Sequence, residues 1–148
     1  HDGWRVTLDT DYNAATKAND TRMRARFSNP SDFKFTIYRK GLLSGLATHL
    51  GMQDVEVGHE GFDREFVIKG NDEHRLKRLF GNPRIRELLE AQPAVHFAVV
   101  EPGWFDGEKE EGKDWLVFTV HGVLKDKERL KALFDLFAET LDELMAVR

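Results

Sequence analysis

Strict alternation of apolar and charged side chains is the feature that most limits how this chain can fold. In residues 21–27, Met23, Ala25 and Phe27 alternate with three arginines. A period of two places the apolar set on one face of a β-strand and the arginines on the other. The pattern predicts a strand with one buried face, and therefore a sheet that packs its apolar side against another layer.

A second alternating segment, residues 33–38, follows the turn-forming residues 29–32 (Asn-Pro-Ser-Asp). Turn formers between two one-sided strands are typical of a β-hairpin. We therefore predict that these two strands pair directly. The polar face of this hairpin is a candidate binding surface, on which Thr36 accompanies Arg22, Arg24, Arg26, Lys34 and Tyr38.

Further strands and loops are predicted from the same signals. Strands are expected at residues 4–8, 54–57, 62–68, 94–100 and 114–121. Residues 9–20 lack periodicity and are rich in turn formers, which indicates a loop. The acidic residues 102–113 are expected to form a long hairpin loop between the last two strands.

Helical spacing of apolar residues predicts three helical regions. A short helix is expected at 41–52, with Gly51 as its stop signal. A broken helix is expected from Asp72, interrupted at residues 81–83 (Gly-Asn-Pro) and ended by Pro93. A long helix begins after Asp126. Its predicted apolar stripe consists of Leu130, Leu133, Phe134, Phe137, Leu141 and Leu144.

Together these elements predict an α+β fold in a single domain over residues 1–148. The order lacks both an internal repeat and regular βαβ alternation. It favours a mostly antiparallel sheet of about six or seven strands, with the short helix, the broken middle helix and the long C-terminal helix packed on one face. A chain of 148 residues is long enough to bury a core of its own.

Composition excludes several classes of function. The chain has no cysteine, which removes disulfides, thiol catalysis and thiolate metal sites. The net charge of −4 gives no general attraction to nucleic acid. No glycine-rich phosphate loop, dinucleotide fingerprint or nucleophile elbow is present, so we expect no cofactor and assign no catalytic or metal-binding residue.

Charge is distributed unevenly, and this asymmetry marks two candidate binding features. Residues 22–40 carry six basic side chains and one acid, whereas residues 101–114 carry six acids and two lysines. The basic hairpin face could bind an anionic partner, or it could be the solvated face of an ordinary sheet. Trp104 and Phe105 begin the acidic loop, where they could anchor a partner or fold back over the core.

One cluster of titratable residues suggests chemistry instead. His59, Glu60, Asp63 and Glu65 lie within seven residues, and Asp63 and Glu65 would share one face of the predicted strand. Carboxylates with a histidine can hold a metal or perform acid–base catalysis. The helical His-Glu-x-x-His arrangement of zinc sites is missing, and a surface turn with ion pairs explains the same residues.

Residues 58–72 resemble a recurring pattern in uncharacterised bacterial proteins. The pattern is a glycine, a short acidic turn, Phe-Asp-x-x-Phe-x-Val and an Asp-started helix, and the similarity covers about residues 33–92. In those proteins the domain often follows an N-terminal membrane anchor. The resemblance implies that the full-length protein is membrane-associated through a segment ahead of residue 1, and it transfers no catalytic residues. Here residues 59–61 (His-Glu-Gly) replace the plain acidic turn.

Three hypotheses of function follow. The first is a non-enzymatic binding or interaction domain, displayed next to a membrane, whose partner is a protein or an anionic membrane surface. The second is a small metal-dependent hydrolase centred on the turn that contains His59 and Asp63. The third is self-assembly as a homodimer through an exposed edge of the sheet.

Overall fold

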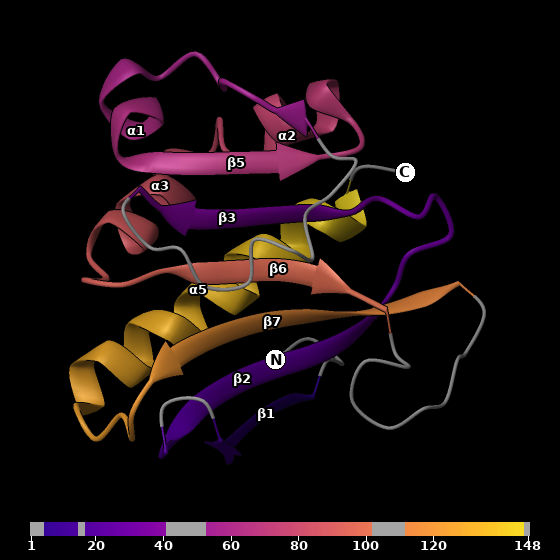
Figure 1. The fold of residues 1–148 in the computed structure, drawn as a ribbon. Helices are drawn as coiled ribbons and strands as arrows, with labels where there is room; N and C mark the ends of the chain where they lie inside the picture. Colours follow the sequence, from indigo (N-terminus) through magenta and orange to yellow (C-terminus); the bar gives the residue numbers. More distant parts are fainter. Residues whose placement is uncertain (1–4, 15–16, 41–52, 102–111, 147–148) are drawn as a thin grey trace.

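The computed structural model describes residues 5–14, 17–40, 53–101 and 112–146. They form an α+β fold in which a long C-terminal helix packs against one seven-stranded antiparallel sheet of order β1-β2-β7-β6-β3-β5-β4 (Figure 1). The strands are β1 (Val6–Asn13), β2 (Ala18–Ser28), β3 (Phe35–Arg39), β4 (Gln53–Asp54), β5 (Phe66–Gly70), β6 (His96–Val100) and β7 (Lys113–His121). The helices are α1 (Glu60–Glu65), α2 (Glu73–Leu79), α3 (Pro83–Glu90) and α5 (Lys127–Ala146).

Phenylalanine rings in edge-on and tilted contact join the sheet to the C-terminal helix. Phe97 of β6 is fully buried, and its ring centroid lies 5.8 Å from those of Phe35 and Phe118 and 5.6 Å from that of Phe137. These three partners belong to β3, β7 and α5, so one ring contacts three other elements. In Figure 1, α5 runs behind β7 and β6 on this side of the sheet. We call the opposite side the outer face.

The three predicted helix starts that fall within the described residues are confirmed. The side chain of Asp72 accepts a hydrogen bond from the backbone N–H of Arg75, 3.1 Å away, at the start of α2. Asn82 caps α3 with Pro83 in its first turn, and Asp126 accepts from the backbone N–H of Glu128 at the start of α5. Asp and Asn side chains thus accept hydrogen bonds from the backbone N–H groups of the first helical turn, which have no acceptor within the helix.

The predicted hairpin between residues 21–27 and 33–38 is wrong. β2 pairs with β1 and β7, whereas β3 pairs with β5 and β6. Turn residues at 29–32 do reverse the chain, but two other strands occupy the space between β2 and β3. β6 and β7 carry buried apolar side chains on both of their faces, for example Ala98 and Val117. These two strands therefore bury more apolar surface at the centre of the sheet than they would at its edge.

Residues 9–20 were predicted to be a loop, and this is also wrong. β1 extends to Asn13, and β2 begins at Ala18, directly opposite Asn13 in the register. The first strand therefore lies later in the chain than the predicted residues 4–8. Local turn formers there are overridden by pairing along the whole β1–β2 ladder, because each further pair adds cross-strand contacts.

The strand predicted over residues 62–68 begins later than expected. Residues 60–65 form α1, and β5 starts at Phe66. Helical geometry brings Phe62 and Phe66 together, with ring centroids 4.6 Å apart. The strand predicted at 54–57 is likewise displaced, since β4 comprises Gln53 and Asp54. Asp63 and Glu65 therefore do not share a strand face.

The apolar stripe of α5 differs from the prediction at two positions. Phe134 is 43% exposed, whereas Leu136 is fully buried. The helix predicted at 41–52 lies outside the described residues. The same holds for the predicted loop 102–113, apart from Gly112 and Lys113, and Lys113 is the first residue of β7.

The phenylalanine core predicts a sharp contrast between two phenylalanine substitutions. Phe97→Ala should lower the free energy of unfolding by about 3–5 kcal/mol, because it removes a ring that contacts three elements. Phe134→Ala should change it by less than about 0.5 kcal/mol, because that ring is exposed. Urea denaturation followed by circular dichroism measures both, and equal losses would contradict this description of the core.

Candidate functional site

Three arginines and a tryptophan lie together on the outer face of the sheet. Met23, Ala25 and Phe27 of β2 point into the core, so Arg22, Arg24 and Arg26 point to the opposite side. The register with β7 places Arg26 directly opposite Trp115. Directly opposite residues of an antiparallel pair share a face, so Trp115 also lies on the outer face.

Trp115 contacts two of the arginines through its ring. The guanidinium carbon of Arg24 lies 5.0 Å from the ring centroid, and that of Arg26 lies 5.3 Å from it. Both distances are within the range of cation–π attraction. Stacking on an aromatic ring restricts the orientation of a planar guanidinium. We call Arg22, Arg24, Arg26 and Trp115 the arginine–tryptophan face.

An acid of the neighbouring strand pairs with two of these arginines. Asp9 of β1 is 3.3 Å from Nε of Arg22 and 3.4 Å from Nη2 of Arg24, each distance measured to a different carboxylate oxygen. The side chains of these arginines are 20% and 23% exposed. Asp9 therefore holds two of the three arginines in place.

Lys34 and Tyr38 do not belong to this face, contrary to the sequence analysis. Tyr38 is 7% exposed and lies on β3, which β7 and β6 separate from β2. Nζ of Lys34 lies 2.6 Å from the buried carboxylate of Asp114 and also binds Asp32. Asp114 lies opposite Phe27 in the register, so Lys34 contributes to packing at the end of β2 and β7.

The ion pair between Lys34 and Asp114 changes the titration of the lysine. Burial by itself lowers the pKa of Lys34, but hydrogen bonds and attraction from Asp114 and Asp32 outweigh it and raise that pKa above its usual value. A lysine whose pKa is raised on folding stabilises the protein fully below the unfolded pKa, and this contribution is lost as pH rises through the folded pKa.

Lys34→Met is expected to lower stability and remove part of its pH dependence. The variant leaves Asp114 buried without its cation, so the free energy of unfolding should fall by about 1–3 kcal/mol near pH 7. The difference between wild type and variant should shrink as pH rises above the ordinary lysine value of 10.5. Urea denaturation at a series of pH values tests this, and a constant difference up to alkaline pH would refute it.

The four titratable residues at 59–65 bind separate partners. Nε2 of His59 lies 3.2 Å from Arg86, and Glu60 pairs with Arg64 at 2.9 Å. Glu65 pairs with Arg39 at 3.1 Å.

Asp63 differs from the other three because its carboxylate binds the backbone. It accepts hydrogen bonds from the N–H groups of Val57 and Gly58, at 3.0 and 3.1 Å. Both oxygens are engaged, so this aspartate fixes the turn that precedes α1.

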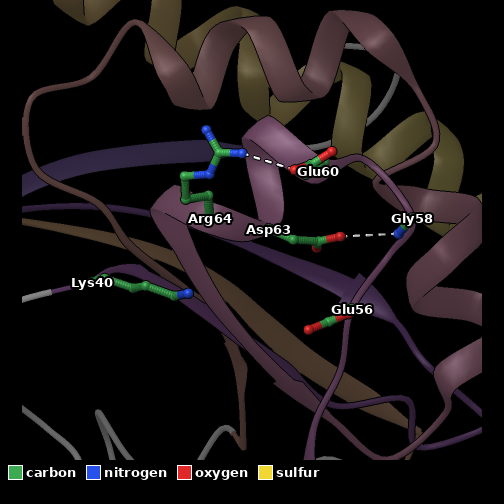
Figure 2. A pocket seen from close by; sticks show the side chains of 6 residues that line it. All are labelled: Lys40, Glu56, Gly58, Glu60, Asp63 and Arg64. Atoms are coloured by element: carbon green, nitrogen blue, oxygen red, sulfur yellow. Dashed lines mark hydrogen bonds and ion pairs between the residues drawn. The ribbon is translucent and has the colours of Figure 1, made fainter.

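A pocket lies beside this turn, with a volume of about 380 Å³. Its lining side chains come from the start of α1 and from neighbouring loops, and Figure 2 shows Glu60 directed to Arg64 and Asp63 directed to Gly58. The lining consists of Lys40, Glu56, Gly58, Glu60, Asp63 and Arg64. His59 and Glu65 do not line it, so the pocket does not gather the four residues singled out in the sequence.

The described residues contain neither a metal-binding cluster nor a membrane-spanning helix. Among residues 5–14, 17–40, 53–101 and 112–146, no three His, Asp or Glu side chains converge so that they could hold a metal ion. None of the helices in this part of the chain is both long and apolar enough to cross a membrane.

A structural role for Asp63 predicts that its removal destabilises the fold. Asp63→Ala should lower the free energy of unfolding by about 1–3 kcal/mol, because two backbone N–H groups lose their acceptor. Glu60→Ala, one turn earlier on the helix surface, should cost less than about 0.5 kcal/mol. Equal stability of the two variants in thermal and urea denaturation would contradict the role assigned to Asp63.

Trp115 is the residue of this site that sequence reasoning missed. Its position between inward-facing Asp114 and Leu116 places it on the outer face, but only the pairing of β2 with β7 brings it to the arginines. Trp104 and Phe105, the other two predicted binding residues, lie outside the described residues.

Comparison of the chain with family models, with curated proteins and with solved structures found no match.

Proposed function

We propose that this chain is a non-enzymatic binding domain that receives an acidic segment of a partner protein on its arginine–tryptophan face. The observation that carries the proposal is the stacking of Arg24 and Arg26 on Trp115 next to a third arginine, with Asp9 as the shared acid. An aromatic ring flanked by arginines is a composition that is enriched in protein interfaces.

The chemistry of arginine supports a carboxylate ligand. A guanidinium presents N–H donors in a fixed fork that matches the two oxygens of a carboxylate. Because Trp115 and Asp9 already restrict the arginines, little side-chain entropy remains to be lost on binding. An extended acidic segment lying along β2 could reach successive arginines, since side chains two residues apart share one face of a strand.

Charge favours a protein partner over a membrane surface. Each basic residue near an anionic membrane contributes about 1 kcal/mol, so three arginines with one paired acid give a weak attraction. The net charge of −4 opposes approach of the whole chain to such a surface.

The resemblance of residues 58–72 to membrane-anchored bacterial proteins adds a second part to the proposal. In that setting the full-length protein is held at a membrane, and this domain presents its arginine–tryptophan face to a protein partner nearby. The anchor brings the two components together, while the specificity resides in the sheet.

Charge reversal on the face tests the proposal. The probe is a fluorescein-labelled decapeptide of alternating glutamate and glycine, whose binding is measured by fluorescence anisotropy at low salt. Arg24→Glu/Arg26→Glu should weaken binding at least tenfold, and rising salt should weaken binding to the wild type because ions screen exposed charges.

A matched control changes net charge equally at another place. Arg64 and Arg84 are exposed on helices, with side chains 71% and 48% exposed, so Arg64→Glu/Arg84→Glu should keep the affinity within about twofold. Equal losses in both double variants would refute the assigned face. Binding to phosphatidylserine vesicles without binding to the peptide would instead replace the protein partner by a membrane.

A further inference from the structure

Five charged side chains line the pocket beside α1, and three of them already have partners within the chain. Glu60 pairs with Arg64 at 2.9 Å. The carboxylate of Asp63 accepts two backbone hydrogen bonds, from Val57 and Gly58. These contacts hold the start of α1 together, and they leave two of the five charged groups of the pocket for a ligand.

The remaining two charged groups, Lys40 and Glu56, are exposed and opposite in sign. Neither side chain forms a hydrogen bond or an ion pair within the part of the chain that the structure describes. Figure 2 shows the ammonium group of Lys40 and the carboxylate of Glu56 directed into the same open space from opposite sides. The pocket therefore presents one cation and one anion that face each other but do not pair.

The backbone that carries these two side chains is anchored. The N–H of Lys40 donates to the carbonyl of Glu65 at 2.9 Å, which fixes the end of β3 beside α1. Glu56 lies between Val55 and Val57, whose N–H groups are bound to β5 and to α1. Both charges thus start from fixed positions, so a ligand has little backbone to order when it binds.

The charges of the lining favour a ligand that carries both signs. Three acids and two bases give the lining a net charge of −1, so a simple anion is attracted by Lys40 but repelled by the acids. A simple cation pairs with Glu56 and leaves Lys40 uncompensated. A molecule with one ammonium and one carboxylate can pair with both groups. The volume of about 380 Å³ is that of a site for a small molecule.

We propose that this pocket binds a short peptide with free termini, whose carboxylate pairs with Lys40 and whose ammonium pairs with Glu56. Because the two protein charges lie on opposite sides of the pocket, they fit the separated ends of a peptide better than the two adjacent charges of one amino acid. Each exposed ion pair contributes at most about fivefold to the affinity, so the dissociation constant is on the order of 1 mM.

Titration with diglycine tests the site. Two-dimensional NMR of the isotope-labelled protein should show shifts at the amides of Gly58 and Asp63, which line the pocket. Two capped probes serve as controls, since N-acetyl-diglycine lacks the ammonium and diglycine amide lacks the carboxylate. Each capped probe should bind at least about threefold more weakly, because one of the two ion pairs is lost.

Exchange of the two charges separates ligand binding from a structural role. Lys40→Glu or Glu56→Lys alone should weaken diglycine binding at least about fivefold, because one terminus then meets a like charge. Lys40→Glu/Glu56→Lys together should restore the affinity to within about twofold, because the peptide can bind in the opposite direction. Lys77→Glu makes the same change of charge in an exposed ion pair of α2 and should leave the affinity within about twofold.

Three outcomes overturn the inference. Absence of shifts at Gly58 and Asp63 with diglycine well above the expected dissociation constant would exclude the site. Equal binding of diglycine and a capped probe would exclude a ligand held by both charges. A double exchange that binds no better than the single reversals would do the same. The acidic decapeptide is tested with variants of Arg24 and Arg26, so failure of this inference is distinct from failure of the proposed function.

Discussion

The pairing of β2 with β7 is the constraint on which the rest of the structure depends. Eight residue pairs join these strands, from Thr21 opposite Val120 to Ser28 opposite Lys113. On the helix-covered side the ladder places Met23 beside Phe118 in the core. On the outer face it places Arg26 beside Trp115. The same ladder thus builds both the hydrophobic core and the candidate binding surface.

Local patterns in the sequence predicted most elements and the fold class. The helix caps Asp72, Asn82 and Asp126 can be predicted from the sequence, because the start of a helix depends on residues within one turn. Alternation identified the inward face of β2. These features follow from neighbours along the chain, so one sequence suffices to find them.

The pairing of strands that are far apart in the chain could not be predicted from the sequence patterns. The turn at residues 29–32 gave a convincing hairpin signal, yet β3 lies three strands away from β2. Choice of strand partner depends on the burial of β6 and β7, whose sequences come some 60 residues or more later. Lys34 and Tyr38 were therefore assigned to the wrong surface, and Trp115 was overlooked as the partner of the arginines.

Ion pairs explain why the charged clusters differ in what they can do. Glu60, Asp63 and Glu65 are each held by a separate group, which leaves them as supports of a turn and a helix. The arginine–tryptophan face is different, because Asp9 pairs with Arg22 and Arg24 while the ring of Trp115 contacts Arg24 and Arg26. In the proposed function, these arginines of the sheet bind the acidic ligand through their guanidinium groups.

The central claim is that an acidic ligand binds to the surface made by β2 and β7. Titration of the isotope-labelled protein with an acidic peptide, followed by two-dimensional NMR, tests it directly. We predict that the largest shifts occur at the indole N–H of Trp115 and at the amides of Arg24 and Arg26. Shifts centred instead on the pocket of Glu60 and Asp63, or on the exposed side of α5, would contradict the account.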